Sequence, residues 1–137
     1  MNKELLQQTI NWLEAGAPER RFDMGKMIDY DDKPNNWCGT TCCIAGYVWQ
    51  QQNSPSDVPT HNIYEFWNQI EVQAAAMLGL KPAIAHRLFY PSSSDNRSYP
   101  GEWEEITPAE AAQAIRNVMA YGEPRWEEIL DFEESFE

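Results

Sequence analysis

A chain of 137 residues is the size of one domain and can bury a core without disulfides or a bound metal. Hydrophobic residues make up 42% of the sequence, which excludes a chain that is disordered throughout. No apolar run reaches the roughly 18–20 residues that a transmembrane helix needs. The amphipathic N-terminus does not resemble a signal peptide, so we expect a cytoplasmic protein with reduced cysteines and no membrane contact.

The formal net charge is −12, and the negative charge is concentrated in the C-terminal third of the chain. Residues 102–137 hold eleven Asp and Glu against two Arg, a net charge of −9. A segment of this composition repels phosphate backbones, so we expect no direct binding to nucleic acid. It suits either a solvated surface or docking onto a basic protein surface.

The chain begins with a predicted helix from about Lys3 to Ala15, which Asn2 can cap and Gly16 can end. Polar and apolar residues then alternate within residues 20–37 on both sides of a Gly25-Lys26 turn, which permits a small β-hairpin. We therefore predict a mainly α fold, either all-α or α+β with a small β-hairpin, of about five to six helices. The predicted globular domain covers residues 1–131, and residues 132–137 form an acidic tail.

Helical spacing of apolar residues recurs in the later part of the chain. The predicted segments are about 42–52, 63–78, 82–89, 107–121 and 124–130. Gly79 can end the second of them and Gly122 the fourth. Thr40 or Thr41 can cap the first of them. The sequence Thr107-Pro108-Ala109-Glu110 gives the clearest boundary, because it combines an N-cap, a proline at the first helical position and a capping glutamate. In the last segment Trp126 is expected to face inward.

Four motifs occur in order along the chain: FDM at 22–24, CGTTCCIAG at 38–46, LGL at 78–80 and TPAEAAQAI at 107–115. Together they resemble a widespread family of small uncharacterised proteins of bacteriophages and bacteria that share a CGTxxCxAG motif. The resemblance spans roughly residues 22–126 and departs from the family at Tyr47, where Trp is more usual. It implies a phage or prophage accessory protein and no established activity.

The three cysteines lie within residues 38–43, at a predicted helix start. Unpaired backbone N–H groups at such a start favour a thiolate, so Cys38 or Cys42 can be considered as a nucleophile, with His86 as its base. No fitting pair of His and Asn is evident, and a buried structural cysteine is the default interpretation. A cysteine-dependent hydrolase or transferase is therefore an alternative to a binding protein.

The same turn offers a second alternative, a nucleotide-like ligand. Free N–H groups after Gly39 can hold an anion, the hydroxyls of Thr40 and Thr41 can assist, and Trp37 can stack on a base. Simple capping of the helix by the two threonines is the favoured interpretation. Adjacent cysteines point apart on a helix and rarely share one ion, so we predict no metal and no cofactor.

The preferred hypothesis is a binding protein that acts on a host protein with a basic surface, in the host bacterial cytoplasm. Its target would be a host defence or nucleic-acid-handling protein, which it would inhibit. The acidic C-terminal third would occupy a basic groove and partly mimic DNA, with aromatic side chains as desolvated anchors. The predicted contact residues are Glu102, Trp103, Glu104, Glu105, Trp126, Glu127, Glu128 and Asp131.

Overall fold

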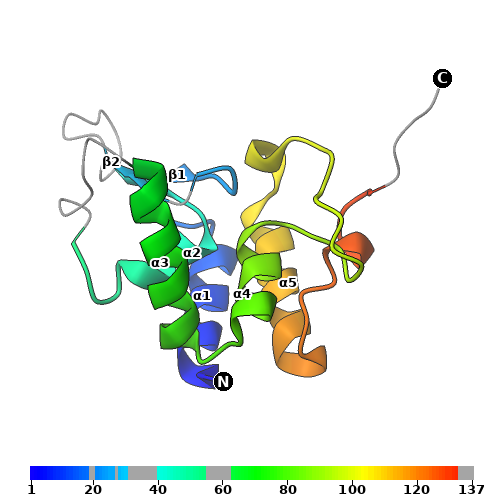
Figure 1. Cartoon of the computed structure of the whole chain (residues 1–137), viewed down its shortest axis with the longest axis horizontal. Coiled ribbons are helices and arrows are strands. Elements are labelled where there is room, and N and C mark those ends of the chain that lie inside the picture. The colour runs from blue at the N-terminus through cyan, green and yellow to red at the C-terminus, as the bar shows by residue number, and fades with distance from the viewer. Residues whose placement is uncertain (19–20, 27, 31–39, 55–62, 133–137) are drawn as a thin grey trace.

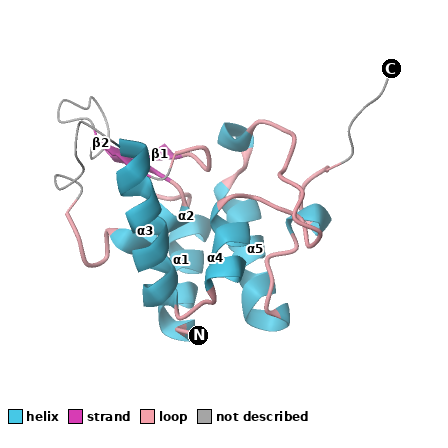
Figure 2. Cartoon of the chain, viewed as in Figure 1, coloured by secondary structure: helices cyan, strands magenta, loops and turns pink. Residues whose placement is uncertain are grey.

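The computed structural model describes residues 1–18, 21–26, 28–30, 40–54 and 63–132 of the chain. These residues form a mainly helical fold with a small sheet, which confirms the predicted fold class (Figure 2). The α-helices are α1 (Lys3–Glu14), α2 (Ile44–Trp49), α3 (Ile63–Leu78), α4 (Pro82–Phe89) and α5 (Pro108–Tyr121). The other described elements are the strands β1 (Arg21–Phe22), β2 (Ile28–Tyr30) and β3 (Thr40–Cys42), and the 3-10 turns η2 (Trp103–Glu105) and η3 (Trp126–Glu128).

Helix α1 lies at the centre of the helical packing, against α5 and in contact with α2 and α3 (Figure 1). Its apolar residues Leu6, Ile10 and Leu13 are almost completely buried, as the helical spacing predicts. An ion pair of 2.6 Å between Arg116 Nη2 and Glu14 Oε1 joins α5 to the end of α1 at the surface. None of the described helices has the length and apolarity needed to cross a bilayer.

The start of α1 is tied to the end of α3 through Asn2. The side-chain oxygen of Asn2 accepts the Leu5 N–H at 3.1 Å, which is the predicted N-cap. Its side-chain amide donates to the Met77 carbonyl at 3.1 Å, and its backbone N–H donates to the Leu78 carbonyl at 2.7 Å. One residue therefore caps both helix ends.

Helix α3 ends at Gly79, as its sequence predicts. Gly79 has a φ of +67°, a left-handed conformation that glycine adopts without strain. Leu80 N–H then donates to the Ala75 carbonyl at 3.1 Å, the long hydrogen bond of a Schellman motif. The chain reverses here and enters α4 at Pro82, so α3 and α4 pack against each other.

The structure has a three-stranded sheet where the sequence predicted a β-hairpin. Strands β1 and β2 exist, but they do not pair with each other, because β3 lies between them. Strand β3 runs parallel to β1, with Phe22 opposite Cys42, and antiparallel to β2, with Ile28 opposite Cys42. A lone two-stranded hairpin is only marginally stable, and the third strand supplies the missing backbone partners.

The helix predicted over residues 42–52 is also shorter than expected. Thr40–Cys42 is strand, Cys43 is extended at φ −96° and ψ −166° as the N-cap, and α2 covers only Ile44–Trp49. Every residue of α2 is buried. Residues 40–42, which were expected to cap and begin the helix, therefore belong to the sheet.

Helix α5 begins as predicted. Thr107 accepts the Glu110 N–H at 3.1 Å, and the Glu110 carboxylate accepts the Thr107 N–H at 2.9 Å, which completes a capping box. The helix ends at Gly122, which is left-handed with a φ of +81°. The last predicted helix is reduced to the single 3-10 turn η3. Phe132, the first residue of the predicted tail, is buried against Tyr99, and residues 133–137 lie outside the described residues.

Candidate protein-binding surface

The turn η2 presents an exposed group of carboxylates, which we call the acidic segment: Glu102, Glu104 and Glu105. A hydrogen bond of 3.1 Å from Glu105 N–H to the Glu102 carbonyl closes the turn. Among the described residues, none of these three carboxylates has a hydrogen-bond or ion-pair partner. The acidic segment therefore keeps its negative charge available to solvent or to a partner.

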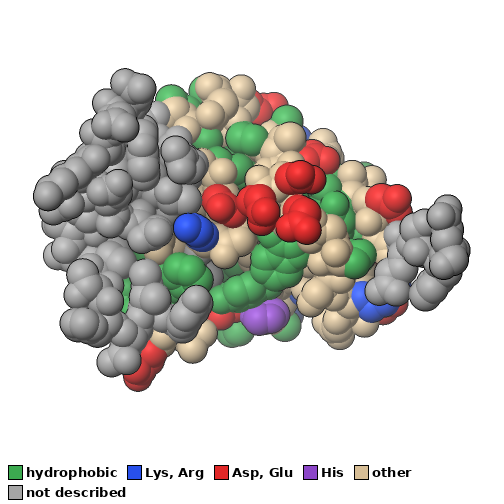
Figure 3. Space-filling view, turned by 90° about the horizontal axis from the view of Figure 1, so that it is seen from above, with side chains coloured by type: hydrophobic (Ala, Val, Ile, Leu, Met, Phe, Trp, Pro, Cys, Tyr) green, Lys and Arg blue, Asp and Glu red, His purple; other side chains and the backbone are tan. Residues whose placement is uncertain are grey.

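Trp103 holds the acidic segment on the fold. Its ring is half-buried, and its indole Nε1–H donates to the Tyr99 carbonyl at 3.0 Å. A methyl group on Gly25 would lie 3.8 Å from Cβ of Trp103, so the turn before β2 abuts η2. Figure 3 shows Asp and Glu side chains gathered on this part of the molecule, beside a strip of hydrophobic side chains. The carboxylates thus stand on an anchored turn.

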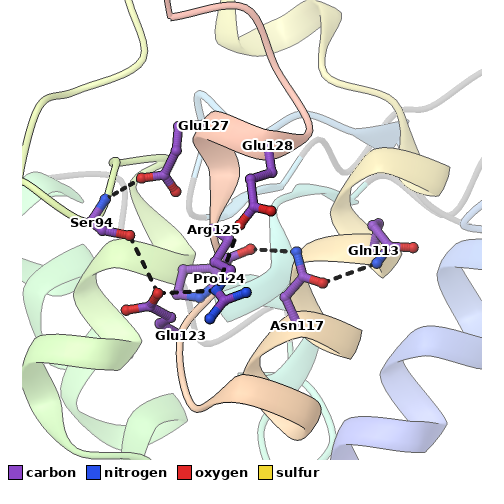
Figure 4. A network of polar contacts seen from close by, with 8 residues as sticks. All are labelled: Ser94, Gln113, Asn117, Glu123, Pro124, Arg125, Glu127 and Glu128. Atoms are coloured by element: carbon purple, nitrogen blue, oxygen red, sulfur yellow. Dashed lines mark hydrogen bonds and ion pairs between the residues drawn. The ribbon is translucent and has the colours of Figure 1, made fainter.

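Two of the other predicted acidic contacts, Glu127 and Glu128, belong to a polar network within the fold (Figure 4). Arg125 Nε lies 3.1 Å from Glu123 Oε1 and 3.6 Å from Glu128 Oε2, and its guanidinium lies 4.0 Å from the centre of the Tyr121 ring. Glu127 Oε2 accepts the Ser94 N–H at 2.5 Å, so it joins the loop after α4 to η3. Glu127 and Glu128 therefore have internal partners that the acidic segment lacks.

The backbone around Pro124 is fixed from α5. Buried Asn117 donates its side-chain amide to the Pro124 carbonyl at 2.9 Å, and it accepts a hydrogen bond of 3.0 Å from Gln113 (Figure 4). Arg125 follows in a left-handed conformation with a φ of +52°. These contacts set the direction in which the chain enters η3.

Trp126 is not part of an exposed contact surface. Its side chain is completely buried, and its indole Nε1–H donates to the Arg87 carbonyl at the end of α4 at 3.0 Å. This placement agrees with the inward orientation expected from the helical spacing and corrects its assignment as a binding anchor. Asp131 is exposed at the end of the packed domain.

Among the described residues, no cysteine is accessible to solvent as the nucleophile that an enzyme would need. Cys42 has no exposed surface in β3, and Cys43 is 1% exposed. Burial raises the pKa of the Cys43 thiol to about 11, although backbone N–H groups of Gly46 and Ala45 act in the opposite direction. His86 is exposed on α4 and pairs with Glu71, and Cys38 lies outside the described residues.

The predicted site for a nucleotide-like ligand required a helix that starts at Thr40 or Thr41, and the structure has a strand there. Thr40 and Thr41 lie in β3, and α2 begins three residues after Thr41, so the two threonines do not occupy its N-cap. Trp37 and Gly39 lie outside the described residues. In the part of the chain that the structure describes, no three His, Cys, Asp or Glu side chains come together as metal ligands.

Comparisons of the chain with models of protein families, with curated proteins and with solved structures found no match. The resemblance to the phage and bacterial family stays a prediction. The sequence predicted Glu102, Trp103, Glu104 and Glu105 as contacts, and the structure brings them together on one exposed turn. Glu127 and Glu128 differ from them in having partners within the fold, a difference that the count of acidic residues alone does not show.

Proposed function

We propose that this protein is a non-catalytic binding protein that docks onto a basic surface of a partner protein through the acidic segment. The observation that carries the proposal is that Glu102, Glu104 and Glu105 are exposed around the anchored Trp103 and have no hydrogen-bond or ion-pair partner among the described residues. Other acidic side chains of the C-terminal third are engaged within the fold, such as Glu110 in its capping box and Glu123 with Arg125. Free carboxylates on a fixed turn are suited to intermolecular contacts.

The charge of the whole chain supports the same proposal. A net charge of −12 steers cationic surfaces toward the protein over a distance of about one Debye length, roughly 8–10 Å at physiological salt. The acidic segment then supplies the close contacts. Charged groups at the rim of an interface act mainly on the association rate and on its salt dependence.

The partner class follows from the charge and from the predicted family context. A protein that handles nucleic acid carries a basic groove for phosphates, and a carboxylate-bearing turn can occupy such a groove. We therefore propose a host nucleic-acid-handling or defence protein as the partner, with this chain as its inhibitor and the acidic segment as a partial mimic of DNA. Duplex DNA would compete for the same groove.

The proposal is tested with a hexaarginine peptide as a probe of a basic surface. The double variant E104Q/E105Q should bind it about fivefold to tenfold more weakly at low salt, because two exposed ion pairs are lost. The decrease of log K with log salt should also become less steep. Fluorescence anisotropy between about 20 and 200 mM NaCl measures both quantities.

The matched control is E4Q/E65Q, which removes two exposed carboxylates from the first turns of α1 and α3. Both double variants change the net charge from −12 to −10, since each loses two negative charges. The control should lose clearly less affinity than E104Q/E105Q at each salt concentration, because Glu4 and Glu65 lie outside the acidic segment and act on the peptide only through the long-range charge of the protein. Equal losses in the two variants would show that the acidic segment has no special role.

A further inference from the structure

An apolar groove of about 530 Å³ lies between α3 and α4. Its walls include Val72, Ala76, Leu80 and Pro82. Val72 is 70% exposed and lies beside the other apolar groups of the groove, so together they present an apolar patch to solvent. A groove of this volume accommodates one or two side chains of a binding partner.

Glu71 and His86 form the polar part of the groove. Glu71 Oε1 lies 2.6 Å from His86 Nδ1, and the Glu71 side chain is 19% exposed while that of His86 is 60% exposed. Because a carboxylate only accepts hydrogen bonds, this contact is a hydrogen bond in the tautomer that carries a proton on Nδ1. The groove thus joins an apolar wall to a negatively charged group, and no described Lys or Arg side chain lines it. This combination favours an apolar ligand with cationic neighbours.

Two aromatic rings connect the groove to the acidic segment. The His86 ring centre lies 4.7 Å from that of Tyr90, and the Tyr90 ring centre lies 6.3 Å from that of Trp103. Figure 3 shows this continuity on one face, where a hydrophobic strip runs from the gathered carboxylates toward a histidine side chain. The two distances limit the separation of the His86 and Trp103 rings to about 11 Å. An extended peptide advances about 3.3 Å per residue, so about three to four residues cover the path between these two rings.

We propose that the groove binds one apolar side chain of the same partner segment whose basic residues contact the acidic segment. The occupant is an extended peptide segment with a Leu-like residue separated from Arg or Lys by three to four residues. This inference rests on the proposed function, to which it adds the sequence pattern of the partner. The acidic segment attracts the partner, and burial of the apolar side chain against Val72 and Ala76 selects it.

The test uses two fluorescein-labelled peptides of twelve residues that carry the same four Arg. They differ in one residue, Leu or Ala, placed four residues before the first Arg. Wild-type protein should bind the Leu peptide about tenfold more tightly than the Ala peptide, because burial of the longer aliphatic side chain is favourable. Anisotropy titrations at two salt concentrations give the affinity and its salt dependence.

The variant V72Q/A76Q replaces the apolar wall by uncharged side chains that favour helix. It should bind the Leu and Ala peptides equally while keeping the wild-type salt dependence. The matched control A120Q, at an exposed position of α5 away from the groove, should keep the tenfold preference. Circular dichroism checks that each variant is folded.

Two outcomes separate the inference from the proposed function. Equal binding of both peptides to wild type, or a Leu preference that survives in V72Q/A76Q, would overturn the role of the groove. Binding that remains dependent on salt and on Glu104 and Glu105 would still support the acidic segment. Conversely, a Leu preference that is lost in V72Q/A76Q, together with unchanged salt dependence in E104Q/E105Q, would retain the groove and reject the acidic segment.

Discussion

Replacing Trp126 with alanine should lower the free energy of unfolding by about 3–5 kcal/mol, the cost of removing a fully buried large aromatic side chain. Trp126 has no exposed surface, and its indole is hydrogen-bonded to the Arg87 carbonyl at the end of α4. The substitution leaves a cavity where η3 meets α4 and leaves a carbonyl without its donor. Denaturation with urea, followed by circular dichroism, measures the loss.

The variant W126F separates packing from hydrogen bonding. It keeps most of the aromatic volume and removes the indole N–H, so its loss should be clearly smaller than that of W126A. A loss below about 1 kcal/mol in W126A would contradict the central packing role of this side chain. It would reopen the interpretation of Trp126 as a surface contact.

The unfolding free energy should also fall at alkaline pH because of Cys43. Burial raises the pKa of its thiol from the ordinary 9.0 to about 11 in the folded state. The folded state therefore holds the proton more tightly than the unfolded state. The stabilisation is complete below pH 9 and is lost as the pH rises through about 11, a decrease of about 3 kcal/mol.

The variant C43A isolates this contribution, since lysine and tyrosine residues also titrate in the alkaline range. Its unfolding free energy should fall less than that of wild type between pH 8 and 11, measured by urea denaturation at each pH. The Tyr90 hydroxyl, whose pKa burial raises to about 12, should cause a further decrease at higher pH in both proteins. If the unfolding free energy of wild type and of C43A depended on pH in the same way, the raised pKa of the Cys43 thiol would be contradicted.

Local rules predicted much of the helical structure. Asn2, Gly79, Thr107 and Gly122 mark helix ends where the structure has them, because caps and left-handed turns depend on a few neighbouring residues. The proline at Pro82 likewise opens α4 as predicted. These signals lie within one helical turn of the boundary that they define, so one sequence is enough to locate them.

The sheet could not be predicted in the same way. Its strands have only two or three residues each, and β3 is inserted between β1 and β2, which precede it in the chain. The pairing of Phe22 and Ile28 with Cys42 is set by tertiary packing and leaves no turn signal. Because residues 40–42 enter the sheet, the start of α2 moves to Ile44, and Thr40 and Thr41 do not cap it.

The candidate surface was predictable in part. The concentration of negative charge in the C-terminal third is evident in the sequence, and it includes the acidic segment. The sequence does not reveal that Glu127 binds the Ser94 N–H, since the two residues come together only when η3 packs beside the loop after α4. The groove could not be predicted from the sequence for a similar reason. It forms only when α3 packs against α4 and leaves Val72 exposed.

The central claim is that a cationic partner docks on the acidic segment. Amide and indole chemical shifts of the isotope-labelled protein, recorded during titration with hexaarginine, test it most directly. The largest changes should occur at the backbone amides of residues 102–106 and at the indole N–H of Trp103. Changes that are spread evenly over the exposed carboxylates, or that centre on residues 123–131, would contradict it.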